Sequence, residues 1–416
     1  MIEYIWLLWF IPAPVFCLFF YRFIQNRQLF INKDLENVPS EYPYLIILVT
    51  SKYAPKIVDE VVDRVHSVAR KIGMAENRYR VEVLVDEINR DIKDANIILV
   101  PPQYKTNKGT LRKGRALQYA LEQRRERKEN NKKIWILHLD EESFVTEQCM
   151  ISVLKYISKE TNPPMSEGAI IYSNKFFEVN VLCRTIECLR PYICYDCVSE
   201  MMGKMPAHIH GSNLLVRSDI EDGVGWDHLN PASEDQRFGW EVWKRYGPVF
   251  GWHGGVLEEQ PPYTIKDMIR QRRRWFIGNC HNLLTCTGIP TMKKVEIELR
   301  WLSWGLGFLS VSSTIAVRLL GALGIIQNIP QWLDPFLIFN MFIWLVGFQI
   351  GLRHNIASMK LSFTRQLRLH LATLIWTFPA GIFDTWAVFS APLYMRNFVW
   401  RPTEKDKVSH LEEDPG

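Results

Sequence analysis

The chain has 416 residues, enough for two or three domains, and 47% of them are hydrophobic. Its 50 basic and 45 acidic residues give a formal net charge of +5 at pH 7. This weak positive charge lies near long apolar segments and forms no basic stripe, which argues against nucleic-acid binding.

Four long apolar segments stand out along the chain. They comprise residues 4–21, 301–317, 335–352 and 371–395, and Asp384 is the one charged residue among them. A helix needs roughly 20 apolar residues to cross the hydrocarbon core of a bilayer. Trp, Tyr, Arg and Lys stand near the segment ends, as at membrane interfaces, so we predict membrane helices. Buried core helices would explain one such run but not four.

The first segment is predicted to be a retained anchor. Glu3 stands where a signal peptide carries positive charge, and no small-residue cleavage site follows the segment. Arg22 and Arg27 come directly after it, so the positive-inside rule places the next domain in the cytosol.

The basic loop at residues 353–370 contains no carboxylate and is expected to be cytosolic as well. Segment 371–395 then either crosses once or re-enters around Pro379, and the sequence leaves both open. The expected organisation is an anchor at 1–25, an α/β domain at 40–260, interfacial helices at 261–296, a membrane region at 297–395 and a tail at 396–416.

Between the first two apolar segments, strands alternate with helices. Short apolar runs predict strands at 44–50, 80–85, 97–100 and 134–139, and helical periodicity predicts helices at 57–72 and 112–127. This alternation predicts an α/β fold with a doubly wound, mostly parallel sheet. Ligands of such sheets bind at the carboxyl ends of strands, so Asp86 and Asp140 are expected to face one crevice.

Asp140 and Glu142 lie in the acidic end of a predicted strand, His-Leu-Asp-Glu-Glu-Ser. Residues two apart in an extended strand point the same way. Such a carboxylate pair suits a hard divalent ion, Mg²⁺ or Mn²⁺, which bridges the two phosphates of a nucleoside diphosphate. A solvated acidic turn is the alternative, and the position after a buried strand favours the metal site.

A second acidic pair, Glu234 and Asp235, follows a Pro-Ala-Ser loop. Ser233 is a candidate helix N-cap, which would place both acids in the first helical turn. Capping chemistry alone explains such a pair. The functional interpretation makes one carboxylate the general base for a hydroxyl acceptor.

Gln271, Arg274 and Trp275 occupy helical positions i, i+3 and i+4 and so share one face. Apolar residues lie on another side of this helix and basic residues beside them, which predicts an interfacial amphipathic helix. A generic membrane-surface anchor needs no Gln-x-x-Arg-Trp arrangement. Arginine binds a diphosphate bidentately, and tryptophan stacks on sugar rings.

Lys113 opens a Lys-Gly-Arg-Ala segment at a predicted helix start. A phosphate contact and a plain exposed helix start are equally consistent with it.

Four cysteines are close together in sequence, at Cys183, Cys188, Cys194 and Cys197. Four thiolates bind zinc, but this spacing lacks the paired short knuckles of structural zinc sites. Packed or surface thiols in a reducing compartment are the favoured interpretation.

Together these motifs resemble the family 2 glycosyltransferases, in the membrane-bound, cellulose-synthase-like branch, with the egghead-type β-1,4-mannosyltransferases most similar. The shared motifs are KGRALQY at 113–119, HLDEE at 138–142, the Glu-Asp pair before an aromatic-rich helix, and Gln-x-x-Arg-Trp after Pro-Tyr-Thr at 262–264. The resemblance covers about residues 44–278, and the stretch between Asn174 and His210 departs from the family pattern.

The resemblance implies a GT-A fold and a role for each matching residue. Asp86 would contact the nucleotide base, and Lys113, Asp140 and Arg274 would bind the rest of the donor. The implied ligands of Mg²⁺ or Mn²⁺ are Asp140 and Glu142. The implied catalytic base is Asp235, with Glu234 beside it. The implied acceptor contacts are Gln271, Trp275, Gly211 and Ser212.

The implied activity is inverting transfer of a sugar from a nucleotide-sugar, most of all GDP-mannose, to a lipid-linked sugar or glycolipid. The product would carry a β-linkage. A processive β-polysaccharide synthase using UDP-glucose or GDP-mannose is the alternative enzyme. A catalytically silent membrane scaffold or transporter subunit is a further alternative, but it has no use for acidic strand ends in a soluble domain.

Overall fold

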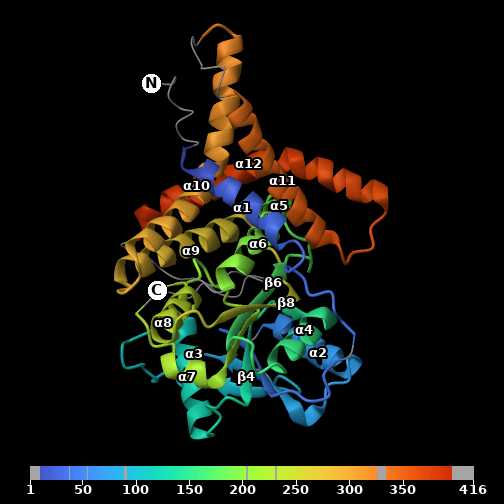
Figure 1. The fold of residues 1–416 in the computed structure, drawn as a ribbon, viewed down its shortest axis with the longest axis vertical. Helices are drawn as coiled ribbons and strands as arrows, with labels where there is room; N and C mark the ends of the chain where they lie inside the picture. The colour runs from blue at the N-terminus through green and yellow to red at the C-terminus, as the bar shows by residue number, and fades with distance from the viewer. Residues whose placement is uncertain are drawn as a thin grey trace.

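The computed structural model describes residues 10–36, 38–53, 55–88, 91–202, 205–229, 232–325 and 334–395. An α/β domain built on one sheet forms one end of the molecule, and long apolar helices gather at the other end (Figure 1). The helix that carries Gln271, Arg274 and Trp275 lies between these two parts.

The sheet has eight strands in the order β3-β2-β1-β4-β7-β6-β8-β5. Their bounds are β1 Tyr44–Ser51, β2 Tyr79–Val85, β3 Asn96–Leu99, β4 Ile134–Asp140, β5 Phe144–Val145, β6 Met165–Ile171, β7 Leu214–Arg217 and β8 Phe250–Glu258. The four predicted strands are parallel neighbours, and β6 and β8 are parallel too. Strand β7 is antiparallel to both β4 and β6, and β5 is antiparallel to β8, so the sheet is mixed.

Strand β1 shows why the central strands read as continuous apolar runs. Leu45, Ile47 and Val49 pack into the core on one face, and Ile46 and Leu48 pack into the core on the other. Successive side chains of a strand point to opposite faces, so a strand covered on both sides needs apolar residues throughout. The first face is covered by helix α2 (Lys56–Lys71), through Val58, Val61, Val62 and Val65; the second by α3 (Arg112–Glu126), through Ala116, Leu117, Ala120 and Leu121.

The α/β domain has further described helices, of which α4 packs on the same face of the sheet as α2. They are α4 Glu147–Ile157, α5 Val181–Ile186, α6 Arg190–Met201, α7 Ser218–Val224, α8 Glu234–Tyr246 and α9 Ile265–Thr285. Thr264 begins α9 as a side-chain cap, since its hydroxyl accepts a hydrogen bond from the backbone N–H of Asp267 at 3.1 Å.

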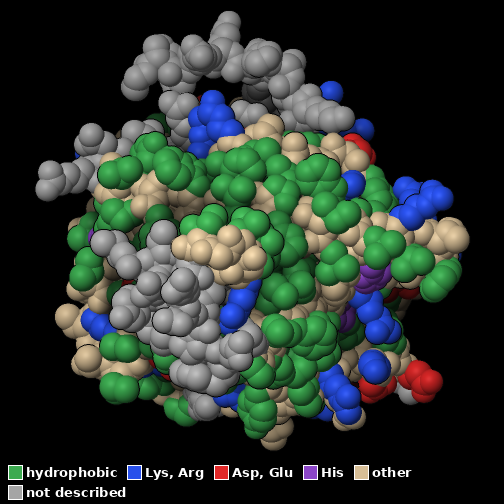
Figure 2. Space-filling model, turned by 90° about the horizontal axis from the view of Figure 1, so that it is seen from above, with side chains coloured by type: hydrophobic (Ala, Val, Ile, Leu, Met, Phe, Trp, Pro, Cys, Tyr) green, Lys and Arg blue, Asp and Glu red, His purple; other side chains and the backbone are tan. Residues whose placement is uncertain are grey.

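Three described helices are long and apolar enough to cross a membrane, and they coincide with the last three predicted segments: α10 (Thr291–Ala322), α11 (Asp334–Ile356) and α12 (Phe363–Tyr394). Figure 2, seen from the end where these helices lie, shows apolar side chains over much of that face. Exposed ones on the three helices include Leu319, Phe339, Phe342, Leu371, Trp376 and Trp386.

The first predicted segment is described only from residue 10 onward. Its described part forms α1 (Pro12–Asn26), which packs against α6, α10 and α11. Residues 4–9 and the tail at 396–416 lie outside the described residues.

Helix α12 differs from the sequence prediction at its start. It begins at Phe363, so Arg365 and Arg368 belong to the helix and not to a loop reaching His370. Ser362 accepts a hydrogen bond from the backbone N–H of Arg365 and starts the helix, and arginine is a good helix former. The helix continues through Pro379 without the break that a re-entrant turn requires.

Candidate active site

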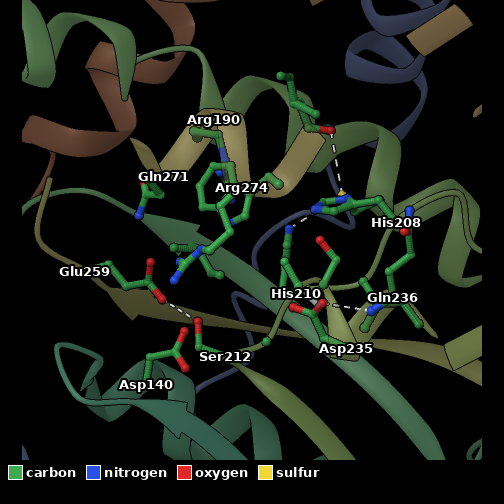
Figure 3. Close-up of a pocket in the computed structure, with 18 of the residues that line it drawn as sticks. Asp140, Arg190, His208, His210, Ser212, Asp235, Gln236, Glu259, Gln271 and Arg274 are labelled. Carbon is green, nitrogen blue, oxygen red and sulfur yellow. Dashed lines mark hydrogen bonds between the residues drawn. The ribbon is translucent and has the colours of Figure 1, made fainter. Parts of the chain in front are cut away.

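One cavity of about 460 Å³ lies at the carboxyl ends of β1, β2 and β4, under α9. Every site residue that the sequence singled out lines it: Asp86, Lys113, Asp140, Glu142, Gly211, Ser212, Glu234, Asp235, Gln271, Arg274 and Trp275. Asp140 lies on the sheet side of this cavity, and Gln271 and Arg274 reach it from α9 (Figure 3). Segments far apart in the chain therefore meet in one place.

Lys113 lies at the centre of the charged groups. Its Nζ is 2.5 Å from Oδ1 of Asp140, 3.2 Å from the carbonyl oxygen of Gly211 and 4.0 Å from Oε1 of Glu234. Burial alone lowers the pKa of an ammonium, but the charges of Asp140, Glu234 and Asp235 outweigh it and raise the pKa of Lys113. Lys113 therefore remains a cation at any physiological pH.

The acidic triplet after β4 is arranged by a turn. The strand ends at Asp140, and Glu141 and Glu142 follow in turn conformation, so strand alternation no longer governs where they point. All three line the cavity, and Glu141 accepts a hydrogen bond from the hydroxyl of Ser51. Carboxylate oxygens are the donors that Mg²⁺ and Mn²⁺ prefer, so this set fits a hard divalent ion.

Asp86 lies at the end of β2, on the rim of the same cavity. It pairs with Arg115 of α3 at 2.6 Å. Arg115 also donates hydrogen bonds to the carbonyl oxygens of Pro101 and Tyr104, at 3.2 and 3.0 Å. Asp86 is thus fixed in position by the same guanidinium that holds the loop between β3 and α3.

Asp235 lies in the first turn of α8 and points into the cavity (Figure 3). Ser233 occupies the N-cap position, as expected, but it adopts a left-handed conformation with φ of 63° and makes no side-chain capping bond. This conformation is unfavourable for a residue with a Cβ and costs about 1–2 kcal/mol. Burial and the neighbouring Glu234 raise the pKa of Asp235 to about 7, against the opposing effect of Lys113.

A buried amide network, which the sequence did not reveal, joins the start of α8 to α9. Gln236 donates from Nε2 to the carbonyl oxygen of Ala207 at 3.1 Å and to Oδ1 of Asn279 at 2.9 Å. Asn282 donates from Nδ2 to Oε1 of Gln236 at 2.9 Å and to the carbonyl oxygen of Ser233 at 3.1 Å. The network fixes the residues on either side of Asp235.

Trp275 of α9 is in contact with two cations. The guanidinium carbons of Arg190 and Arg272 each lie 4.5 Å from its ring centroid. Such cation–π contacts stabilise by about 0.5–2 kcal/mol each and fix the ring plane. Gln271 and Arg274 line the cavity beside it.

Arg272 is fully buried, although it lies among the basic residues of α9. It pairs with Glu187 at 2.5 Å and with Asp384 of α12 at 3.6 Å. Asp384 also accepts a hydrogen bond from the indole N–H of Trp304 at 3.2 Å. The one charged residue of the apolar segments therefore ties α12 to α9 and α10.

Two further residues of the cavity were missed by the sequence interpretation. Arg112, next to Lys113 in the chain, lines the cavity together with Arg274, and burial and the charge of Arg274 lower the pKa of Arg112. Glu259 follows β8 and accepts hydrogen bonds from the hydroxyls of Ser143 and Ser212. Asp140 was identified because it is a carboxylate at the end of a predicted strand. Glu259 has the same position after β8, but the three glycines of β8 obscure its apolar pattern, so this strand was not predicted.

The sequence matches the family described as Glycosyl transferase family group 2 over residues 135–395. It is 29% identical to the β-1,4-mannosyltransferase egh of Drosophila melanogaster over 310 residues, which are 68% of this chain and 62% of that protein. It is 27% identical to the β-1,4-mannosyltransferase bre-3 of Caenorhabditis elegans over 290 residues, 65% of this chain and 60% of that protein. The match thus spans less than two thirds of these relatives.

Two solved structures are similar to this chain at low identity. The mannosyltransferase PcManGT from Pyrobaculum calidifontis, in complex with GDP-Man and Mn²⁺, superposes with a TM-score of 0.49 at 14% identity, covering 93% of this chain and 99% of that one. TarS 1-349 of S. aureus, in complex with UDP, gives a TM-score of 0.35 at 12% identity, covering 88% and 94%.

Proposed function

Since this chain belongs to the glycosyl transferase family group 2, and is a glycosyltransferase with a GT-A-like mixed sheet, we propose that it transfers mannose from GDP-mannose to a lipid-linked sugar. The transfer inverts the anomeric carbon and yields a β-linkage. The relatives named β-1,4-mannosyltransferases support the choice of sugar.

The observation that carries this proposal is the position of Asp235. Its carboxylate shares one cavity with Asp140, Lys113 and Arg274, and its pKa is raised to about 7. A general base works best when its pKa lies near the operating pH. Asp235 therefore combines the location and the basicity that deprotonation of an acceptor hydroxyl requires.

The basic residues of the cavity suit the donor diphosphate. Lys113, Arg112 and Arg274 line the cavity with positive charge, and arginine binds phosphate oxygens bidentately. Asp140 and Glu142 would hold a Mg²⁺ or Mn²⁺ ion, which would neutralise charge on the departing nucleoside diphosphate. Asp86, which also lines the cavity, would contact the nucleotide base.

The chemical step follows from this arrangement. Asp235 accepts the proton of the acceptor hydroxyl while the hydroxyl oxygen of the acceptor forms a bond to the anomeric carbon of the donor sugar. The bond between that carbon and the diphosphate oxygen breaks, and the electron pair leaves with the diphosphate, whose charge Lys113 and Arg274 stabilise. Attack from the face opposite the leaving group inverts the configuration.

The membrane end of the cavity supports a lipid-linked acceptor. Apolar and aromatic residues from three helices extend the lining away from Asp235: Phe16 and Phe19 of α1, Trp301 and Trp304 of α10, and Ile343 and Trp344 of α11. A sugar carried on a lipid would enter along this side with its chain still in the bilayer. Arg22 and Arg27 favour a cytosolic α/β domain.

The experiment uses the purified full chain in detergent with GDP-mannose, Mn²⁺ and a glucosyl lipid, and follows GDP release and product mass. We expect release of GDP together with a product heavier by a single hexose. A ladder of products would identify a processive synthase. Release of nucleotide only from a different nucleotide-sugar would overturn the assigned donor, and release from none would overturn the activity.

A further inference from the structure

Two cysteines and two histidines meet beside the active site, in the stretch that departs from the family pattern. Cys194 and Cys197 are three residues apart on α6 and so share one face of the helix. His208 and His210 come from the segment that leads to Gly211. Cys194, Cys197 and His210 are buried, and His210 lies close to Asp235 (Figure 3).

Three sulfur–nitrogen distances among these side chains match the edge of a tetrahedral zinc site. Nε2 of His210 lies 3.7 Å from Sγ of Cys194 and 3.8 Å from Sγ of Cys197. Nδ1 of His208 lies 3.6 Å from Sγ of Cys197. With Zn–S near 2.3 Å and Zn–N near 2.05 Å, a tetrahedral site has a sulfur–nitrogen edge of about 3.6 Å. The ligand atoms of Cys194, Cys197 and His210 all lie within 4.8 Å of one another.

The outer nitrogen of His210 faces a buried carboxylate. Its Nδ1 lies 3.6 Å from Oε2 of Glu167 on β6, and its backbone N–H donates to Oε1 of Glu167 at 2.6 Å. Neither Nδ1 nor Oε2 has a hydrogen-bond partner within the described residues, although both are buried. Metal binding at Nε2 places the ring proton on Nδ1, where it faces this carboxylate, as is usual for metal-bound histidines.

We infer that Cys194, Cys197 and His210, with His208 as the nearest fourth donor, form a structural Zn²⁺ site. Thiolate and imidazole ligands select zinc over Mg²⁺ and Mn²⁺, so this site is chemically distinct from the carboxylates at Asp140. Each thiol releases its proton to solvent on binding. The other two neighbouring cysteines are not part of it, because Cys183 packs against Ile186 and Met268, and Cys188 packs in a separate apolar cluster.

The position of the site gives it a role. It joins α6 to the segment 207–213, and Gly211 in that segment lies directly against Asp235 and Lys113. A bound ion would hold this segment in place and thereby set the position of the catalytic carboxylate. Zinc would act here through protein structure and not through contact with substrate.

The test measures the zinc content of the purified full chain in detergent after gel filtration into metal-free buffer, which removes weakly bound ions. We expect equimolar zinc in the wild-type chain and in Asp140→Asn, and loss of zinc in Cys197→Ser. Cys183→Ser, at a buried cysteine outside the cluster, is the matched control and should retain zinc. Glu167→Gln should weaken zinc affinity by on the order of 10- to 100-fold.

X-ray absorption at the zinc edge of the wild-type chain keeps the inference testable if Cys197→Ser does not fold. Two sulfur and two nitrogen neighbours are expected. Absence of zinc from protein made in zinc-supplemented medium, or zinc with only nitrogen and oxygen neighbours, would overturn the inference. In those cases the four side chains form a hydrogen-bonded thiol–imidazole cluster without metal.

Discussion

Gly211 and Asp235 are in direct contact, and the absence of a side chain on Gly211 makes this possible. A Cβ placed on Gly211 would lie 2.7 Å from Oδ2 of Asp235 and 2.9 Å from Nζ of Lys113. Real Cβ contacts are almost never this short, so the side chains of both Asp235 and Lys113 would have to move. The backbone of Gly211 therefore packs directly against the proposed base, Asp235, and the central cation, Lys113.

Gly211→Ala is expected to lower turnover while the protein still folds. A displacement of about 1 Å at a catalytic group is enough to reduce a rate by on the order of 100-fold. Turnover and thermal unfolding are measured on the same preparation. Gly73→Ala is the control, because its Cβ meets nothing within 4 Å but its φ of 74° is strained, so it should lower stability and leave turnover unchanged. Full turnover in Gly211→Ala would contradict the proposed contact.

The raised pKa of Asp235 predicts the pH dependence of turnover. The carboxylate must be ionised to accept a proton, so turnover should reach a plateau above pH 7, the approximate pKa of this group, and fall below it. The fall should approach about tenfold for each pH unit. The check is a profile of kcat between about pH 5 and pH 9, where one group dominates the acidic limb. A flat profile across neutral pH would exclude Asp235 as the titrating base.

The same pKa predicts a stability effect of the opposite sign. A carboxyl whose pKa is higher in the folded chain than its ordinary 3.8 holds its proton more tightly when folded. Ionisation therefore costs stability progressively from about pH 4 to pH 7, and the cost is complete above pH 7. Asp235→Asn should melt at a higher temperature than the wild type at pH 8, with the difference vanishing near pH 4. Asp63→Asn, at an exposed position, should shift the melting temperature little.

The buried pairing of Arg272 predicts a large destabilisation on its removal. Arg272→Gln leaves Glu187 and Asp384 as buried carboxylates without their cation, which typically costs about 3–5 kcal/mol. Arg270→Gln is the matched control in the same helix, because its pair with Asp267 at 3.5 Å is partly exposed and contributes at most about 1 kcal/mol. Denaturant unfolding in detergent measures both, and equal losses in the two variants would contradict the account.

The amide network at the start of α8 predicts a further, smaller loss. Asn279→Leu removes the acceptor for Gln236 and leaves a buried amide donor unsatisfied, which costs about 1–3 kcal/mol. Asn131→Ala, at an exposed bend, loses only solvent-exposed hydrogen bonds and should cost little. Thermal unfolding compares the two, and an unchanged melting temperature in Asn279→Leu would show that the network does not support α8.

The parts of the fold that the sequence predicted are those with local signals. β1 and most of β4 are covered on both faces and form apolar runs, whereas β2 alternates around Arg80 and Glu82; Asp86 and Asp140 follow from where β2 and β4 end. β5 has two residues, β7 has four, and β8 contains three glycines, so none carries a readable pattern. The position of β7 between β4 and β6, antiparallel to both, depends on pairing between segments that are distant in sequence, so no local pattern predicts it.

Local sequence patterns also could not predict which individual side chains are buried. Arg270, Arg272 and Arg273 look alike in sequence, and only the distant Glu187 and Asp384 determine that Arg272 is the buried one. In the same way, the spacing of the cysteines gave no reason to pair Cys194 and Cys197 with His210, because the three meet only when α6 packs beside the segment before β7.

The most direct measurement of the central claim is mannose transfer by Asp235→Asn, with GDP-mannose affinity determined on the same sample. The substitution keeps the shape of the side chain and removes its ability to accept a proton, so transfer should fall by at least about 100-fold. Donor affinity should stay close to that of the wild type, because Lys113, Asp140 and Arg274 are unchanged. Transfer at a near wild-type rate would show that another group removes the acceptor proton, and would contradict the proposed mechanism.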